Sequence, residues 1–410
     1  MTGNGLRPGA TAGARSSRRD PAIDALRGMA LLGILVVNLP FFAMPYGFAG
    51  SWWKQSDPFY LGTLAAFLIQ ALFENKFILI FAFLFGMGAA GQIAGAGTRK
   101  FVTRMLVMVV LGLLNAIFVF EADILLPYAL IGLVFLPVQR CSIRTVLTLA
   151  ALLWTVAILN HALFAIHLAS STSAPGFTQE ARIALFRDGD VLAIAGQRLR
   201  DWISFSRYNL IVLMPMTASA FCFGIVAFRE RVAARGAGYP TLKGVARLLL
   251  WPALLGNGVY AALSLAPASW AGGYVFLANL VLRPIFAPLL SFVIFAYLIE
   301  FLGSARRVAL RDFFAASGRI SLSLYMAQGL AGSLLFFGYG FGLYAGPGLP
   351  AVFALSLLLS AVFAALAAFW SARFGAGPLE RLLARILAMA ARGAETSGRR
   401  SAAEAGPMPG

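Results

Sequence analysis

The chain has 410 residues, of which 60% are hydrophobic and 12% are charged. A soluble protein carries about 25% charged residues, so this composition excludes a water-soluble domain and predicts that lipid covers part of the surface. The net charge of +17 would suit nucleic acid, but the basic residues recur in short groups between apolar runs and form no single basic face, which excludes that partner. Cys141 and Cys222 give neither a disulfide framework nor a metal spacing.

Both ends of the chain are predicted to be disordered. Residues 1–19 are rich in Gly, Ala, Ser and Arg and have no apolar periodicity, and residues 391–410 are similar. Residues 20–390 between them form one predicted transmembrane domain. A cleaved signal peptide is the alternative for the first apolar run, but the run from Met29 is long and no small-residue cleavage site follows it. Asp20 and Pro21 instead predict a helix cap and a first helical residue.

Ten apolar runs are long enough to cross a bilayer of about 30 Å, which needs roughly 20 helical residues. The fold class is therefore an all-α, polytopic membrane bundle. The predicted spans are Asp24–Met44, Phe77–Ala96, Phe101–Phe120, Asp123–Val138, Val146–Leu168, Tyr208–Phe228, Val245–Leu265, Tyr274–Leu302, Ser317–Phe337 and Ala351–Phe374.

The apolar stretch Phe59–Phe73 is predicted not to cross. Without it as a span, 25 of the 33 Lys and Arg residues fall on one side of the membrane, as the positive-inside rule requires. The count predicts a bacterial-type plasma (inner) membrane protein with both termini in the cytoplasm. Phe59–Phe73 then becomes an outer re-entrant or interfacial helix. Such backbone is tolerated only beside protein or a water-filled cavity, so it indicates a cavity open to the outer side.

Ionisable residues inside a membrane are costly, and each is a site hypothesis. Asp24 and Arg27 are three residues apart at the inner start of the first span, where they form either an anchoring ion pair or part of a site. Arg283 lies inside its span beside Pro284 and close to Pro288, which loosen the helix. A buried ion pair and an anion-binding role both remain open for Arg283.

A second group of charges lies near the outer ends of the spans. Glu121 and Asp123 bracket the short outer turn after the third span, and Glu74 and Lys76 stand at a comparable depth. We expect these residues to converge with Arg283 on one outer-facing cavity.

Uncharged polar residues and glycines inside the spans have simpler interpretations. Asn38 and Asn115 are typical of hydrogen bonds between helices. The small-residue run Gly86–Gly91 lacks the lysine of a phosphate loop and predicts close helix packing. The loop Gly338–Tyr344 is rich in Gly and aromatic residues and is either an interfacial anchor or a lid over the cavity.

Several short motifs, in this order along the chain, resemble the YeiB-like family, domain of unknown function 418. Each motif alone is weak, but their order and combination from about residue 20 to 390 are specific. They are Ile23–Leu35 with Asn38, Asn75–Phe77 leading into Phe83–Gly88, Asp123–Leu125 with Tyr128, Gly318–Leu322 with Tyr325 and Gln328, Phe337–Gly340, and Gly377–Glu380.

The resemblance implies a fold related to a superfamily of transmembrane acyltransferases. Such a bundle moves an acyl group from a cytoplasmic acyl-CoA to a small-molecule or glycan acceptor on the far side. Those enzymes use a histidine as base, whereas this chain has Asn115 at the position where the YeiB-like family commonly has one. An amide cannot take up a proton near pH 7, so Asp123, Glu74 or Glu121 would have to serve as the base. Asp123, Asn115 and Glu74 are the candidate catalytic residues.

The candidate substrate-binding residues follow the same scheme. Arg27 and Arg319 are expected to hold the anionic acyl donor at the inner opening, and a passage near Asn38 is expected to join the two faces. Acyl-CoA is a co-substrate here, no cofactor is permanently bound, and no metal site is expected. The full candidate set is Asp24, Arg27, Asn38, Lys76, Arg283, Arg319, Tyr325 and Gln328.

Two other functions remain open from the sequence. A small-molecule transporter would use a broken helix near Arg283, although no internal repeat supports two related halves. A non-catalytic binding or scaffold protein of the cell envelope would tolerate Asn38→Ala and Asp123→Ala without loss of function.

Overall fold

The computed structural model describes residues 20–45, 54, 57, 59–170, 179–230, 239–266 and 273–404, and this part of the chain contains helices and turns with no strand. The predicted all-α class is therefore confirmed. The main helices are α1 (Pro21–Ala43), α2 (Leu61–Leu68), α3 (Lys76–Ala96), α4 (Thr98–Phe118), α5 (Leu125–Val134), α6 (Ile143–Ser170), α7 (Gln179–Asp188), α8 (Val191–Tyr208), α9 (Met214–Arg229), α10 (Tyr239–Leu265), α11 (Gly273–Gly303), α12 (Val308–Arg319), α13 (Ser321–Phe336), α14 (Leu349–Phe374) and α15 (Pro378–Glu404).

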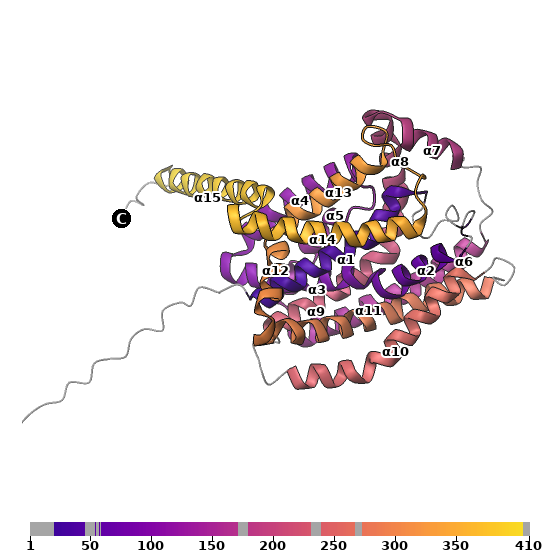
Figure 1. Cartoon of the computed structure of the whole chain (residues 1–410). Coiled ribbons are helices and arrows are strands. Elements are labelled where there is room, and N and C mark those ends of the chain that lie inside the picture. The colour runs from indigo at the N-terminus through magenta and orange to yellow at the C-terminus, as the bar shows by residue number, and fades with distance from the viewer. Residues whose placement is uncertain are drawn as a thin grey trace, which may run out of the picture.

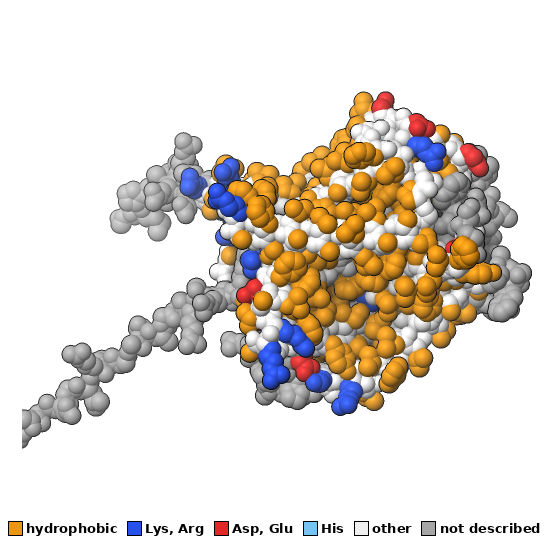
Figure 2. All heavy atoms as spheres, in the orientation of Figure 1, with side chains coloured by type: hydrophobic (Ala, Val, Ile, Leu, Met, Phe, Trp, Pro, Cys, Tyr) orange, Lys and Arg blue, Asp and Glu red, His pale blue; other side chains and the backbone are white. Residues whose placement is uncertain are grey.

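The described helices provide the membrane-crossing segments that the sequence predicts. Eight helical runs are long and apolar enough to cross a bilayer, and the shorter apolar helices α5 and α13 join them. Together they coincide with the ten predicted spans. Apolar side chains cover most of the middle of the face in Figure 2, whereas charged side chains gather toward its ends. That distribution is typical of a polytopic membrane protein, because a bilayer solvates the apolar belt.

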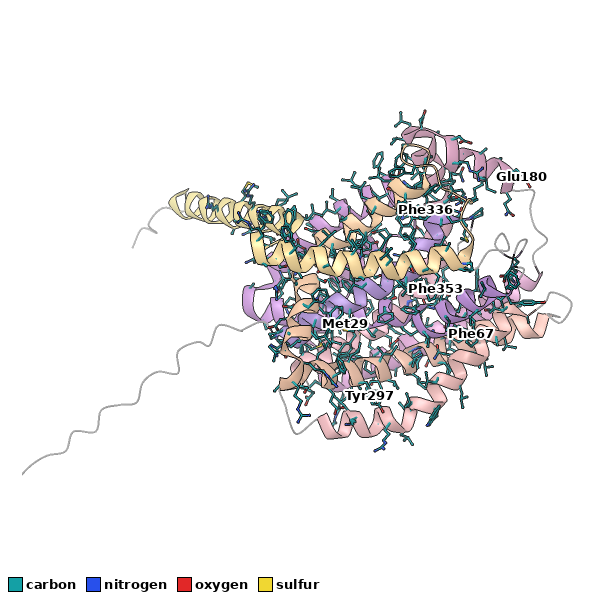
Figure 3. The ribbon with its side chains drawn as sticks, in the orientation of Figure 1. Met29, Phe67, Glu180, Tyr297, Phe336 and Phe353 are labelled. Atoms are coloured by element: carbon teal, nitrogen blue, oxygen red, sulfur yellow. The ribbon has the colours of Figure 1, made fainter. Side chains whose placement is uncertain are left out.

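The two ends of the bundle differ. The helices α1, α4 and α13 begin at one end, at the left of Figure 1, and α3 and α14 finish there. We call it the basic end, because Arg27, Arg99, Lys100, Arg104 and Arg319 line an opening there. The short helices α7 and α8 lie at the opposite end, which we call the far end (Figure 1). In Figure 3, Met29 of α1 lies toward the basic end, and Phe336 of α13 and Glu180 of α7 lie toward the far end.

Helix α1 is the central element of the bundle. It starts as predicted, with Pro21 in the first turn and Asp20 Oδ1 accepting a hydrogen bond from the amide of Ala22 at 2.8 Å. Its most apolar window is 78% buried, the largest share of any candidate span. It packs against α3, α12, α13 and α14. A helix that is apolar on all sides and buried at this level belongs to the core of the bundle.

Glycines allow two helix pairs to pack backbone against backbone. A Cβ at Gly28 or Gly318 would collide with backbone atoms of α12 or α1, and a Cβ at Gly86 or Gly224 would collide with α9 or α3. The predicted close packing at the run Gly86–Gly91 is confirmed at Gly86. These contacts fix α1 against α12 and α3 against α9.

Helix boundaries differ from the prediction in three places. The expected span Ser317–Phe337 is divided at Ile320, so Arg319 ends α12 and α13 starts afresh at Ser321. The expected span Asp123–Val138 contains only the ten residues of α5, which rise about 15 Å and cannot cross alone. Helix α15 runs on to Glu404, whereas the sequence predicts a disordered tail from residue 391.

The predicted re-entrant stretch Phe59–Phe73 forms a short helix that a turn separates from α3. Helix α2 has eight residues and continues into one π-helical turn, Ile69–Phe73. Asn75 adopts a left-handed conformation with φ of 63°, and α3 begins immediately after it. An eight-residue helix rises about 12 Å, far less than a bilayer. Helix α2 packs against α10 and α14.

Candidate functional site

A cavity of about 1450 Å³ opens at the basic end of the bundle. Binding pockets in proteins measure roughly 300–1,000 Å³, so this cavity has room for a large ligand. Helices α1, α3, α4, α13 and α15 supply most of its lining, and α5, α9 and α12 contribute further residues. The predicted donor residues Arg27 and Arg319 both belong to that lining, on α1 and at the end of α12.

The mouth of the large cavity is basic, and two of its arginines pair with neighbouring side chains of the mouth. Arg27 Nη1 lies 2.8 Å from Asp24 Oδ1, which confirms that the two residues share one face of α1. Arg104 Nη1 donates to Gln92 Oε1 at 3.0 Å. Ion pairs and amide partners hold the long side chains at the rim, so an anionic ligand meets arginines that are already positioned.

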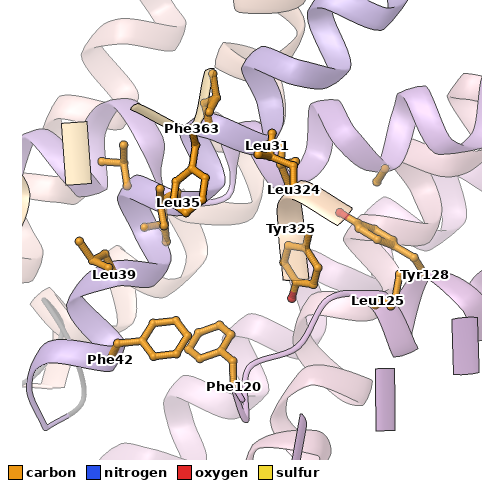
Figure 4. Packing of buried hydrophobic residues seen from close by; sticks show 14 of the residues in the cluster. Leu31, Leu35, Leu39, Phe42, Phe120, Leu125, Tyr128, Leu324, Tyr325 and Phe363 are labelled. Carbon is orange, nitrogen blue, oxygen red and sulfur yellow. The ribbon is translucent and has the colours of Figure 1, made fainter. Parts of the chain in front are cut away.

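Deeper in, the large cavity becomes apolar. Leu31, Leu84 and Met108 line its walls, and it ends at Leu125 and Tyr325. Figure 4 shows Leu31 and Tyr325 in this core region, with Tyr128 and Leu125 beside them. A cavity with a basic mouth and an apolar depth fits a ligand that has a charged head and an apolar tail.

A buried cluster of hydrogen-bonded residues closes the deep end of the large cavity, away from its basic mouth. Asp123 Oδ1 accepts from Asn115 Nδ2 at 2.8 Å and from the Tyr325 hydroxyl at 3.0 Å, and its Oδ2 accepts from the amide of Leu126 at 2.7 Å. The amide of Ile124 donates to the Tyr325 oxygen at 3.2 Å. Asp123 is 3% exposed. The cluster joins the α4–α5 turn to α13, so residues about 200 positions apart form one unit.

A second, small cavity lies on the other side of this cluster. Its lining consists of Leu35, Asn38, Phe42, Asn115, Phe120, Tyr325, Gln328 and Gly329. The space open to a water-sized group is about 10 Å³, roughly enough for one water. Tyr325 lines both cavities. The sequence predicts a continuous passage near Asn38; the described residues instead form two separate cavities that share Tyr325 in their linings.

Two amides of the small cavity keep open hydrogen-bonding positions. Within the described residues, Asn115 Oδ1 and Gln328 Nε2 are buried and have no hydrogen-bond partner. Buried polar groups in native proteins are nearly always satisfied. An open acceptor and an open donor on one cavity indicate a place for a polar ligand.

Aromatic rings cover the small cavity toward the far end. Phe42 and Phe120 stack with ring centroids 4.5 Å apart, as Figure 4 shows, and Phe337 packs on Phe42 at 5.9 Å. Phe337 belongs to the loop that follows α13, and Phe186 of α7 packs on it at 5.3 Å. The small cavity is therefore covered at the far end by aromatic side chains from α1, the α4–α5 turn and the α13–α14 loop.

Helices α7 and α8 fasten this cover through charged residues. The buried Arg198 of α8 donates to the Phe118 carbonyl at 2.6 Å, lies 3.8 Å from Glu121, and stacks on Phe337 at 4.3 Å. Arg182 pairs with Asp201 at 2.8 Å. Burial raises the pKa of Glu121, and the Arg198 guanidinium opposes that rise. Glu121 therefore belongs to the cover and not to the two cavities.

The remaining predicted charges form a separate cluster. Glu74 Oε1 lies 3.1 Å from Arg283 Nη1, and Lys76, which is fully buried, donates to the Gln70 carbonyl at 2.6 Å and to the Tyr260 hydroxyl. None of these residues lines either cavity. The predicted convergence of Glu74, Lys76 and Arg283 with Asp123 on one cavity is therefore wrong. These charges are held between the turn after α2 and the helices α10 and α11.

Comparisons with known proteins agree on one family. A family model described as "Protein of unknown function (DUF418)" matches residues 227–390. The uncharacterized protein YxaH of Bacillus subtilis is 27% identical over 402 residues, which cover 90% of this chain and 94% of the relative. The uncharacterized protein YeiB of Escherichia coli is 32% identical over 118 residues, which cover 28% of this chain and 30% of the relative. Over these ranges the chain is similar to proteins of the YeiB-like DUF418 family. No solved structure gives a significant match.

The DUF418 match and the site overlap only in part. Residues 227–390 include Arg319, Tyr325 and Gln328 on α12 and α13. Asp123 and Asn115 lie outside this range. The cluster at the end of the large cavity is therefore assembled from both halves of the chain.

Sequence reasoning missed two features of the site. It assigned Tyr325 to substrate binding, whereas Tyr325 is the residue that borders both cavities and bonds Asp123. It gave Arg198 no role, although Arg198 is almost fully buried and connects α8 to the α4–α5 turn. A basic residue in an amphipathic helix such as α8 ordinarily faces water. No pattern in the sequence separates Arg198 from its exposed neighbours.

Proposed function

We propose that this protein transfers an acyl group from an acyl-CoA bound in the large cavity to an acceptor bound in the small cavity. The observation that carries this proposal is the position of Tyr325, which borders both cavities and donates its hydroxyl proton to the buried Asp123. A group-transfer enzyme needs two substrate sites that meet at one proton-handling group.

The large cavity suits the donor. The phosphates of an acyl-CoA match the basic mouth formed with Arg27 and Arg319, because guanidinium groups bind phosphate through paired hydrogen bonds. The pantetheine arm and the acyl group match the apolar walls near Leu31 and Met108. The thioester carbonyl then lies at the deep end of the large cavity, beside Tyr325. The positive-inside rule supports a cytoplasmic position for the basic end, where acyl-CoA is available.

The proton path runs through Tyr325 to Asp123. The acceptor hydroxyl passes its proton to the Tyr325 oxygen while the Tyr325 proton moves to Asp123 Oδ1, and the acceptor oxygen bonds to the thioester carbonyl carbon. The carbon–sulfur bond breaks, and the departing thiolate takes back one proton along the same path. The products are an ester and CoA with a free thiol. Asn115 and the amide of Leu126 hold the Asp123 carboxylate in place.

Plugging the large cavity tests the donor site. A Cβ at Gly88 would meet only Arg27 Nη2, at 3.8 Å, so the tryptophan of Gly88→Trp would extend into the cavity without a backbone clash. We expect this variant, purified in lipid nanodiscs, to lose binding of acetyl-CoA and octanoyl-CoA by at least tenfold. Binding is measured by equilibrium dialysis of the radiolabelled thioesters, and turnover by release of the CoA thiol.

A matched control places the same bulk elsewhere. Gly244 on α10 is exposed, and a Cβ there would meet none of the described atoms within 4 Å. Gly244→Trp should bind both thioesters as the unchanged protein does. Equal binding by Gly88→Trp and the unchanged protein, or no binding by either, would refute the donor site.

Transport is the second candidate, because two cavities that meet at one tyrosine also describe a closed solute path. In a transporter the acyl-CoA thioester would stay intact. Proteoliposomes loaded with acetyl-CoA on one side distinguish the two, since transfer releases the CoA thiol and transport moves the whole molecule.

A further inference from the structure

The orientation of the Asn115 amide in the small cavity is fixed by the Asp123 carboxylate. A carboxylate oxygen accepts hydrogen bonds and an ionised carboxylate cannot donate, so the atom of Asn115 that contacts Asp123 Oδ1 must be the NH₂ group. Asn115 Oδ1 is the atom left without a partner among the described residues, and so is Gln328 Nε2. Asn115 and Gln328 are 2% and 4% exposed, and both line the small cavity. One acceptor and one donor therefore remain open there.

The charge of the surroundings restricts what binds between these amides. No charged side chain belongs to the lining of the small cavity as far as the chain is described, and Asp123 lies directly behind Asn115 and Tyr325. A carboxylate or phosphate placed there would lose its hydration and face a negative group. An ammonium has donors only, so the Gln328 NH₂ group would stay unsatisfied.

The size of the small cavity restricts the ligand further. The space open to a water-sized group is about 10 Å³, which is close to one water. A hydroxyl group has this size. It also donates one hydrogen bond and accepts others, so it satisfies Asn115 Oδ1 and Gln328 Nε2 together.

We infer that the small cavity is an acceptor subsite that selects a neutral molecule by a single hydroxyl group, held between Asn115 Oδ1 and Gln328 Nε2. The inference rests on the proposed acyl transfer and adds the class of acceptor. The hydroxyl oxygen then stands beside Tyr325; for the transfer step its one proton turns from Asn115 Oδ1 to the Tyr325 oxygen, while the Gln328 Nε2 hydrogen bond keeps the oxygen in place. The product is an O-acyl ester of an uncharged alcohol, and amines and organic acids are excluded.

Three small molecules of matched size test the selection. Glycerol is neutral, serinol carries an ammonium in place of the central hydroxyl, and glycerate carries a carboxylate in place of one CH₂OH group. The unchanged protein in nanodiscs is given radiolabelled acetyl-CoA with each compound, and the acylated products are separated by chromatography. We expect glycerol to be acylated at least tenfold faster than serinol or glycerate at equal concentration.

Gln328→Leu tests the donor amide. The leucine keeps similar volume but cannot donate, so the KM for glycerol should rise about tenfold while the Kd for acetyl-CoA stays unchanged. Ser333→Ala is the matched control, because Ser333 is buried on the same helix but bonds the Leu330 carbonyl of that helix. A second variant, Gln328→Met, guards against a folding defect in the first, and size-exclusion profiles of all three are compared.

The possible outcomes distinguish a failure of the proposed acyl transfer from a failure of the acceptor subsite. No thioester cleavage with any compound would overturn the proposed function and this inference together. Cleavage that releases acetate at a rate independent of glycerol would leave the donor site standing and overturn the acceptor subsite. The acceptor subsite is also overturned if serinol or glycerate is acylated as fast as glycerol, or if both Gln328 variants keep the KM of the unchanged protein.

Discussion

Two polar clusters lie inside this bundle, and they differ in what their atoms contact. The cluster of Glu74, Lys76 and Arg283 is held between α2, α10 and α11, and its charges face one another, the Gln70 carbonyl and Tyr260. The cluster of Asp123 and Tyr325 stands between two cavities.

Because only the second of these two clusters borders the two cavities, we choose it as the candidate site. Both clusters satisfy the general rule that buried charges are costly and need partners. Judged from the sequence alone, the lysine and arginine of the first cluster are more unusual within a membrane-spanning bundle than the carboxylate and tyrosine of the second cluster. We propose the chemistry for the second cluster, which contains a single carboxylate and a tyrosine, because it stands between the two cavities.

Breaking the first cluster is expected to produce the largest change in stability. Arg283→Met leaves Glu74 buried without its ion-pair partner, so the free energy of unfolding should fall by roughly 3–5 kcal/mol. Thermal unfolding in nanodiscs measures the loss. The double variant Glu74→Gln with Arg283→Met removes both charges and should recover part of it. Folded Arg283→Met protein that has lost acyl transfer would contradict the structural assignment of this cluster.

Breaking the second cluster is expected to lower turnover; in Asp123→Asn the new NH₂ group also leaves one buried donor of the cluster without an acceptor, which costs about 1–3 kcal/mol of stability. Asp123→Asn keeps the size of the side chain but removes the proton acceptor, and Tyr325→Phe removes the hydroxyl between the cavities. Each should lower kcat by about 100-fold or more, because positioned proton transfer contributes roughly 10²–10⁴-fold. The Kd for acetyl-CoA should stay within twofold. Asp312→Asn, an exposed carboxylate on α12, serves as the control. Unchanged turnover in both variants would rule out this proton path.

The basic mouth is expected to give a smaller effect on donor binding. Arg319→Gln removes one cation from the lining of the large cavity, so the Kd for acetyl-CoA should rise about tenfold and depend less on salt. Isothermal titration at two salt concentrations measures both changes. An unchanged Kd would mean that the phosphates bind elsewhere.

The smallest effect is expected at an exposed pair outside both clusters. Lys243 and Glu300 are 2.6 Å apart, and their side chains are 51% and 42% exposed. Exposed ion pairs contribute about 0–1 kcal/mol, so Lys243→Gln should leave both the unfolding temperature and the acetyl-CoA Kd close to those of the unchanged protein. A loss comparable to that of Arg283→Met would remove the distinction between buried and exposed pairs.

The fold was largely predictable from the sequence, because apolar run length is a direct consequence of bilayer thickness. Each of the ten predicted spans overlaps a helix, and Asp20 caps α1 as expected. The breaks were not predictable. Ile320 interrupts an apolar run without Gly or Pro at that position, and the shortness of α5 depends on the neighbours that bury it.

The sequence predicts which residues belong to the candidate site but not how those residues are grouped. Arg27, Arg319, Asn38, Asn115, Asp123, Tyr325 and Gln328 were all candidates from the sequence, and all of them line a cavity or bond to a residue that does. Which of these residues lie together was not predictable, because the sequence places both Glu74 and Asp123 near the outer ends of the predicted spans. Which helix pairs face each other depends on packing contacts such as Gly28 against α12, which no single-sequence pattern reveals.

We propose that an acyl donor occupies the large cavity with its reactive carbon at Tyr325. A structure in lipid nanodiscs with a non-hydrolysable thioether analogue of acetyl-CoA at saturating concentration tests this placement. We expect density for the phosphates beside Arg27 and Arg319 and for the acyl carbon in contact with the Tyr325 hydroxyl. An empty large cavity, or an analogue bound with its acyl end away from Tyr325, would contradict it.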